Sequence, residues 1–236
     1  MNMTSYPNPS GAVMNADEVN RRVRVYLNKV YMWMAIALIT TATVAAYAAD
    51  STETMMWVTS GAGSLITILG SLGIIVIMHL MRNKLTAGAL TMLFLTYSAL
   101  TGLFFGPLLV VYTSQSLGLA FGCTAGTFGA MSLYGAMTKR NLSTMGRFMF
   151  MALIGLIICS VLNIFVGSSM LDFVICIAGV LIFSGLTAYD TQKLIEEGGI
   201  LEEHQMAKPA VFGALSLYLD FINLFLYILR LIGNRD

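Results

Sequence analysis

Charged residues are scarce in this chain of 236 residues, at only 11% of the total. A soluble domain carries roughly 25% charged residues, because water must solvate its surface. Apolar residues make up 57% instead, and the mean hydropathy is +0.79. The composition therefore excludes an ordinary soluble domain and predicts an all-α integral membrane protein with little chain outside the bilayer.

Several chemical signatures are also missing. The net charge of +1 offers no basic excess of the kind that binds nucleic acid. The sequence contains no GxGxxG after a strand, no P-loop and no HExxH, so we expect no cofactor and no enzyme activity. His79 and His204 are expected on different loops, as ordinary surface histidines. Cys123, Cys159 and Cys176 lie in apolar runs without metal-ligand spacing, which predicts free thiols in the core.

Seven apolar runs are long enough to cross a bilayer, since a spanning helix needs about 20 residues. They cover roughly residues 30–49, 57–80, 85–105, 116–137, 148–167, 171–192 and 209–232. Pro107 and the polar stretch 112–116 separate the third and fourth runs. We expect residues 1–16 to form a disordered polar tail and residues 17–29 a polar helix at the membrane surface. Residues 17–236 would then form one seven-helix domain.

The distribution of Lys and Arg predicts the orientation. With the N-terminus inside, 11 of the 13 Lys and Arg residues fall on inside segments. Only Arg230 and Arg235 fall outside, and cytoplasmic loops are the ones enriched in positive charge. Seven spans then place the C-terminus outside.

Two rows of small residues recur at every fourth position, a spacing that lets helix backbones approach closely. They are Ser98, Gly102 and Gly106, and then Gly118, Gly122 and Gly126. We interpret both rows as packing surfaces within one bundle rather than as a dimer face, and we expect a monomer.

Ten of the 12 acidic residues are expected in loops or tails, and two, Asp190 and Asp220, are not. An acid inside the bilayer is costly and is therefore a candidate functional group. Asp220 is expected about 16 Å deep, at about 1.5 Å per residue. It belongs to a polar stripe at helical spacing, made of Gly213, Ser216, Asp220, Asn223 and Tyr227. The stripe predicts that the seventh helix is central and faces a polar cavity.

Structural roles are open for both acids. Ser216 and Asn223 could simply satisfy a neutral Asp220, and Asp190 could be an interfacial or capping residue. If the two carboxylates meet, they cannot both ionise in a low-dielectric site, so they would share a proton and respond to pH. Deprotonated, they are oxygen ligands of the kind that calcium prefers.

The segments around both aspartates resemble one family. Residues 185–192 (GLTAYDTQ) and 215–225 (LSLYLDFINLF) are similar to the last two helices of the Bax inhibitor-1 (transmembrane Bax inhibitor motif) family. Residues 129–134 and 139–143 are similar to its bacterial members. The resemblance covers roughly residues 20–235.

The resemblance implies a seven-helix fold, with the last helix enclosed by the other six, in the bacterial inner membrane. It also implies a pH-sensitive calcium leak, with Asp190 and Asp220 as the sensor and the calcium ligands. A basic residue near the inner end of the second helix, Arg82 or Lys84, would partner the pair. The implied partners are the lipid bilayer, the calcium ion and, for some members, other membrane proteins in stress response or quality control.

Two other functions compete with a cation pathway. The first is a regulatory protein that binds other membrane proteins and transports nothing. The second is an intramembrane aspartyl protease, suggested by Tyr189-Asp190. That class carries Gly-x-Gly-Asp on the next helix, whereas bulky residues 217–219 precede Asp220 here. The expected Pro-Ala-Leu is also missing, so the protease fits poorly.

Overall fold

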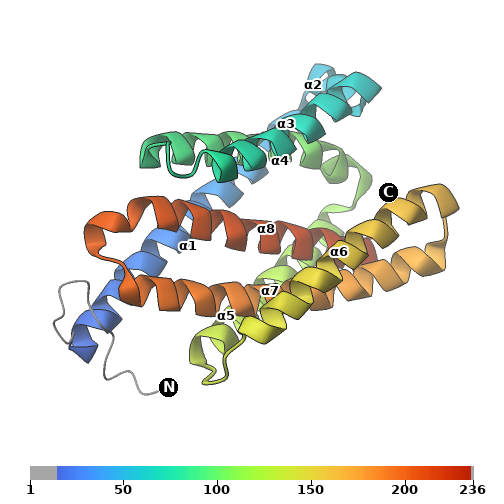
Figure 1. Cartoon of the computed structure of the whole chain (residues 1–236). Coiled ribbons are helices and arrows are strands. Elements are labelled where there is room, and N and C mark those ends of the chain that lie inside the picture. Colours follow the sequence, from blue (N-terminus) through green and yellow to red (C-terminus); the bar gives the residue numbers. More distant parts are fainter. Residues whose placement is uncertain (1–14, 235–236) are drawn as a thin grey trace. The chain divides into compact units, whose positions relative to one another are not determined.

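The protein is built from helices joined by short turns over residues 15–234, the residues that this computed structural model describes. Its elements in order are α1 (Ala16–Asp50), α2 (Thr52–Thr59), α3 (Gly61–Leu80), α4 (Ala87–Val111), α5 (Ser114–Met137), α6 (Ser143–Val166), α7 (Ser169–Ile200), the 3-10 helix η1 (Glu203–Gln205) and α8 (Ala207–Ile232) (Figure 1). Among the described residues, seven helices are long and apolar enough to cross a membrane. They correspond to the seven predicted runs. The predicted tail lies almost wholly outside the described residues.

Three predicted boundaries are wrong. Residues 17–29 do not form a separate surface helix, because α1 continues without a break from Ala16 to Asp50. Pro107 does not end the third span: α4 passes through it and ends at Val111. The second run is divided at Ser60, which ends α2 and caps α3 by accepting a hydrogen bond from the Gly63 amide at 3.0 Å.

The described chain divides into two compact units. The first contains the residues of α1 up to Leu27, then Gln115–Glu203 with α5, α6 and α7, and then Ser216–Gly233 of α8. Within it, α6 and α7 lie side by side, as the yellow and orange helices of Figure 1 show. Gly167 ends α6 in the left-handed conformation, at φ 65°, and begins the short connection to α7.

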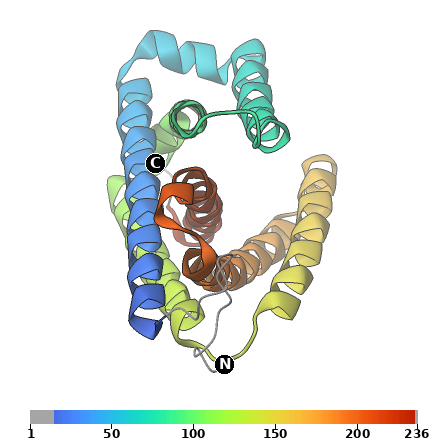
Figure 2. The same ribbon diagram turned by 60° about the vertical axis from the view of Figure 1, so that its left-hand side comes forward.

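The second unit contains Asn28–Ser114, His204–Leu215 and the end of the chain from Asn234. Within it, α3 packs on α4, and α2 contacts both. Figure 2 shows α2 (cyan, at the top) as the short helix that turns the chain from α1 into α3. Thr41 of α1 donates its hydroxyl hydrogen bond to the Ser98 carbonyl of α4 at 2.9 Å.

The two rows of small residues differ in their surroundings. In the first row, a Cβ on Gly102 would lie 2.6 Å from the Thr41 carbonyl oxygen of α1, and a Cβ on Gly106 would lie 2.7 Å from Ala48 Cβ. This row packs within the fold, as predicted. In the second row, a Cβ on Gly118, Gly122 or Gly126 would meet no described atom within 4 Å. The predicted internal packing is therefore wrong for the α5 row.

The three cysteines are free thiols, as predicted. Their predicted core location holds only for Cys176, which is buried in α7. Cys123 of α5 and Cys159 of α6 are exposed. Exposed apolar side chains and thiols on a spanning helix need no protein partner, because lipid solvates them as well as a protein core does.

Candidate functional site

The seventh span, α8, is the most buried of the seven. About 61% of its apolar window is buried, whereas the other spans reach at most 39%. Asp220 is only 5% exposed, and Ser216, Asn223 and Tyr227 of the predicted stripe are half-buried. Apolar side chains on other faces, such as Leu217, are fully buried too. A larger share of α8 is therefore buried than of any other span, and Asp220 of its stripe faces protein.

Asp190 of α7 meets this stripe. The Ser216 side chain of α8 lies close enough to the Asp190 carboxylate to act on it, and the carboxylates of Asp190 and Asp220 interact electrostatically. Ser216 lies one helical turn before Asp220, so the contact brings the two acids to neighbouring levels of adjacent helices. Asp190 is not at a helix end, because α7 continues to Ile200. A capping role for Asp190 therefore does not apply.

Glycines on two neighbouring helices let α7 approach at the level of Asp190. A Cβ on Gly135 of α5 would lie 2.2 Å from the Ala188 carbonyl oxygen. A Cβ on Gly146 of α6 would lie 2.5 Å from the Tyr189 ring. Both contacts involve residues directly before Asp190, so the absence of two side chains positions this carboxylate.

A second polar stripe, on α5, was missed by the sequence analysis. The buried positions of α5 are Ser116, Ala120, Thr124, Phe128, Ser132 and Gly135. Successive members are three or four residues apart, so they form one buried stripe that winds gradually around the helix, and every second member from Ser116 to Ser132 is polar. That spacing was available in the sequence. The row of glycines lies on the opposite, exposed face of the same helix, and it was this row that was interpreted as a packing surface.

Besides Arg22 Nη1 of α1, three buried polar atoms of the first unit have no hydrogen-bond partner among the described residues. They are Asp220 Oδ2, Ser132 Oγ and Thr191 Oγ1. Buried polar groups are nearly always satisfied in folded proteins, so orphaned ones indicate a ligand, an ion or internal water. They come from α8, α5 and α7, the three helices that meet around the aspartates.

An exposed ion pair lies at the end of α8 that would be outer in the predicted orientation. Arg230 of α8 pairs with Asp172 near the start of α7. One turn before Arg230, the Tyr227 ring stacks on Phe183, with 5.9 Å between ring centroids. The same ring lies where a Cβ on Gly179 would be, at 2.5 Å. The polar stripe of α8 thus ends at an aromatic and ionic contact with α7.

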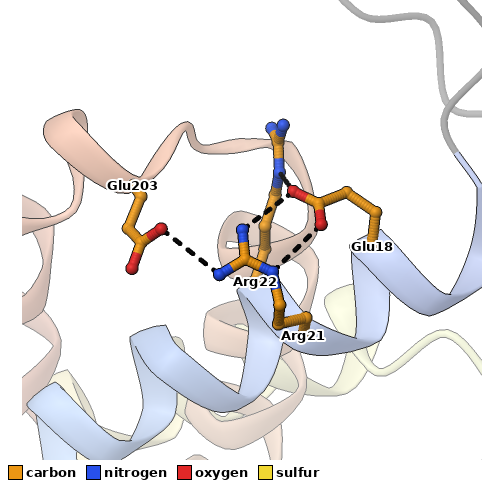
Figure 3. A network of polar contacts seen from close by, with 4 residues as sticks. All are labelled: Glu18, Arg21, Arg22 and Glu203. Atoms are coloured by element: carbon orange, nitrogen blue, oxygen red, sulfur yellow. Dashed lines mark hydrogen bonds and ion pairs between the residues drawn. The ribbon is translucent and has the colours of Figure 1, made fainter.

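Beyond the other end of α7, a polar cluster joins α1 to the 3-10 helix η1, as Figure 3 shows. Glu18 accepts hydrogen bonds from Arg21 Nε at 3.0 Å and from Arg22 Nε at 2.9 Å, and Arg21 Nη1 reaches Glu203 Oε2 at 3.4 Å. Ion pairs exposed to water contribute little to stability, because water and salt screen them. The cluster therefore mainly fixes where the loop after α7 lies against α1.

Contacts between α1 and α7 explain why α7 extends beyond the predicted apolar run. The buried Tyr26 donates a hydrogen bond to Glu197 at 3.1 Å. A Cβ on Gly198 would lie 2.9 Å from the Tyr26 ring, and Gly199 faces Val19. These polar and glycine contacts carry no apolar periodicity, so the last turns of α7 could not be predicted from the sequence.

The two candidate basic partners lie in the turn between α3 and α4. The Arg82 guanidinium lies over the Phe212 ring of α8, 5.1 Å from its centroid. His79 meets the same ring edge-on at 5.6 Å. Lys84 is exposed in the turn. The role of Arg82 or Lys84 as partner of the aspartates stays a prediction.

The residues at the site do not form a dense metal-binding cluster. Within residues 15–234, no group of three or more His, Cys, Asp or Glu side chains could hold a metal ion. Calcium takes 6–8 oxygen ligands. Any calcium passing the two aspartates would therefore need neutral oxygens from hydroxyls, carbonyls or water.

The fold and the buried acids define a multi-pass α-helical membrane protein with ionisable groups inside its spans. A family model described as "Inhibitor of apoptosis-promoting Bax1" matches residues 23–236. The chain therefore belongs to the Bax inhibitor-1 family, as the sequence resemblance implied.

Named relatives agree with this assignment. The chain is 46% identical over 217 residues to "Inner membrane protein YbhL" of Escherichia coli K12, covering 90% of this chain and 93% of the relative. It is 42% identical over 217 residues to an uncharacterized protein of Deinococcus radiodurans, covering 91% and 93%. It is 42% identical over 214 residues to an uncharacterized protein of Borreliella burgdorferi, covering 89% and 92%. Together with the seven apolar spans, the first relative confirms the expected inner-membrane location.

Proposed function

We propose that the protein is a pH-sensitive calcium leak channel, with Asp190 and Asp220 as the pH sensor and as ligands of the passing ion. The observation that carries the proposal is that Asp190 of α7 and the buried Asp220 of α8 lie close enough to interact, with Ser216, one helical turn before Asp220, beside Asp190. Family membership supports the same function, because the resemblance to the Bax inhibitor-1 family implies it.

The mechanism follows from the chemistry of neighbouring carboxylates. Two carboxylates in a low-dielectric site repel each other when both are charged, and they hold either a proton or a cation between them. Protons and calcium thus compete for the same oxygens. The charged groups that act on Asp190 are Lys193 and Glu197 of α7 and Asp220 of α8, and Tyr26 of α1 holds Glu197 in place. A change in the charge of the pair favours a different arrangement of α7 and α8.

The proposed channel has its N-terminus inside, its C-terminus outside and α8 at the centre of the bundle. The high buried share of α8 supports the central position. The orientation rests on the Lys and Arg count.

Reporter fusions test the orientation. A reporter that is active only in the periplasm should be active when fused after the last residue, and inactive when inserted in the loop between α5 and α6. A reporter active only in the cytoplasm should give the reverse pattern and serves as the control. A cytoplasmic signal at the C-terminal fusion would remove one span from the proposed topology.

Calcium flux tests the function. Purified protein in liposomes loaded with a calcium indicator should admit calcium at a rate well above that of empty liposomes, and the rate should change between acid and neutral pH. Empty liposomes at each pH correct for passive leak. Protein-containing liposomes that match the empty ones at every pH would contradict the channel.

One observation favours a second function, a regulatory protein that binds other membrane proteins without transport. The row Gly118, Gly122 and Gly126 on α5 is open, and small residues at this spacing are typical of helix–helix contacts in membranes. The same flux assay separates the two functions, because a non-transporting partner moves no calcium.

A further inference from the structure

Ser132 of α5 carries no charge and lies within residues 129–134, the segment that is similar to bacterial members of the family. Its side chain is buried, at 8% exposure, and its Oγ has no hydrogen-bond partner among the residues that the structure describes. A serine in a membrane helix commonly satisfies its hydroxyl on its own backbone, as Thr124 does by donating to the Ala120 carbonyl at 2.7 Å. Ser132 differs from Thr124 in leaving its hydroxyl available.

Two contacts of α5 determine where Ser132 faces. One turn before it, the Phe128 ring packs against Phe221 of α8, with 5.5 Å between centroids. One turn after it, Gly135 packs against the Ala188 carbonyl of α7. Positions 128, 132 and 135 share one helix face. Ser132 therefore faces the space between α7 and α8.

Each of these contacts adjoins an aspartate. Phe221 directly follows Asp220, and Ala188 lies two residues before Asp190. Ser132 thus lies at the level of the two carboxylates, on the third helix that surrounds them. One carboxylate oxygen of Asp220, Oδ2, is also buried without a partner among the described residues. A carboxylate oxygen and a hydroxyl oxygen lie in one buried region without partners, and one bound cation could satisfy both of them.

We propose that Ser132 Oγ is a neutral calcium ligand opposite Asp220 Oδ2, so that α5 forms the third wall of the ion site. The inference rests on the proposed calcium leak and adds a ligand to it. Two carboxylates alone fall short of the 6–8 oxygens that calcium takes. Unlike a carboxylate, a hydroxyl adds an oxygen without adding charge, which keeps binding weak enough for an ion to leave.

Calcium dependence of flux is the first test. Ser132→Ala should raise the calcium concentration for half-maximal flux about fivefold, the change expected for losing one neutral oxygen contact. The matched control is Thr124→Val, on the same face of α5, whose hydroxyl is already satisfied within the helix; its half-maximal concentration should equal that of the wild type. Size-exclusion elution and thermal melting in detergent establish that both variants fold.

The second test replaces the hydroxyl of Ser132 by a thiol and measures block of calcium flux by a soft metal, so it does not depend on a small change in calcium affinity. Thiols prefer soft metals, so Ser132→Cys should make calcium flux sensitive to block by micromolar Cd²⁺. Wild-type protein, which carries the exposed Cys123 on the same helix, should keep its flux in the same Cd²⁺. Gly129→Cys, on the open face of α5, is the matched variant and should also be insensitive.

The outcomes separate this inference from the proposed function. If wild-type protein moves calcium and Asp220→Asn alters that flux, but both Ser132 variants behave like the wild type, then the Ser132 ligand is wrong and the leak stands. If Ser132→Ala changes the pH response without changing the calcium dependence, Ser132 orders water or a proton, and the calcium ligand is again wrong. If wild-type protein moves no calcium at any pH, both proposals fall together.

Discussion

Asp220→Asn should give a folded protein whose calcium flux no longer changes between acid and neutral pH. Asp220 is 5% exposed, and one of its carboxylate oxygens has no partner among the described residues. The amide keeps the shape of the side chain but cannot bind or release a proton in this range. A buried carboxylate is costly to ionise, so the substitution should not lower stability. Flux from liposomes at a series of pH values gives the measurement.

The control removes an aspartate that lies away from the pair. Asp50 is exposed at the end of α1, and Asp50→Asn should keep the wild-type pH response. Asp190→Asn and the double variant should each match Asp220→Asn, because a proton shared by two carboxylates needs both. Such a cycle is strongly non-additive. Two single effects that add to give the double effect, or a wild-type pH response in Asp220→Asn, would leave Asp220 as a lone buried acid without a sensing role.

The sequence was most informative where lipid imposes a simple rule. All seven spans were predictable, because backbone groups in a bilayer must be satisfied within a helix of about 20 apolar residues. Helix ends outside that rule were not predictable. The first turns of α1 and the last turns of α7 are polar, and they are ordered by tertiary contacts such as that between Tyr26 and Glu197. The capping role of Ser60 was not predicted, because Ser60 lies inside a predicted apolar run.

The two rows of small residues show a limit of spacing arguments. Gly102 and Gly122 occupy equivalent places in rows of identical spacing. A Cβ on Gly102 would meet α1, whereas a Cβ on Gly122 would meet no described atom within 4 Å. Spacing reports which residues share a helix face, but it does not report what covers that face. The polar stripe of α8 was predictable for a different reason: an aspartate in a spanning helix must face protein, whereas a glycine can face either protein or lipid.

Gly135→Ala adds only one methyl group, yet it should destabilise the protein and change the pH response of the site. The added Cβ would lie 2.2 Å from the Ala188 carbonyl oxygen, which is backbone and cannot rotate away. Relieving that clash requires α5 and α7 to separate, and overpacking of this kind costs roughly 3 kcal/mol. In a chain of this size that corresponds to a fall of about 6–10 °C in melting temperature. Since Ala188 lies two residues before Asp190, the pH response of flux should shift as well.

The matched control is Gly129→Ala on the same helix, where a Cβ meets no described atom within 4 Å, and its melting temperature should change by no more than about 2 °C. Equal melting temperatures for Gly135→Ala and Gly129→Ala would show that the α5–α7 contact does not hold Asp190 in place.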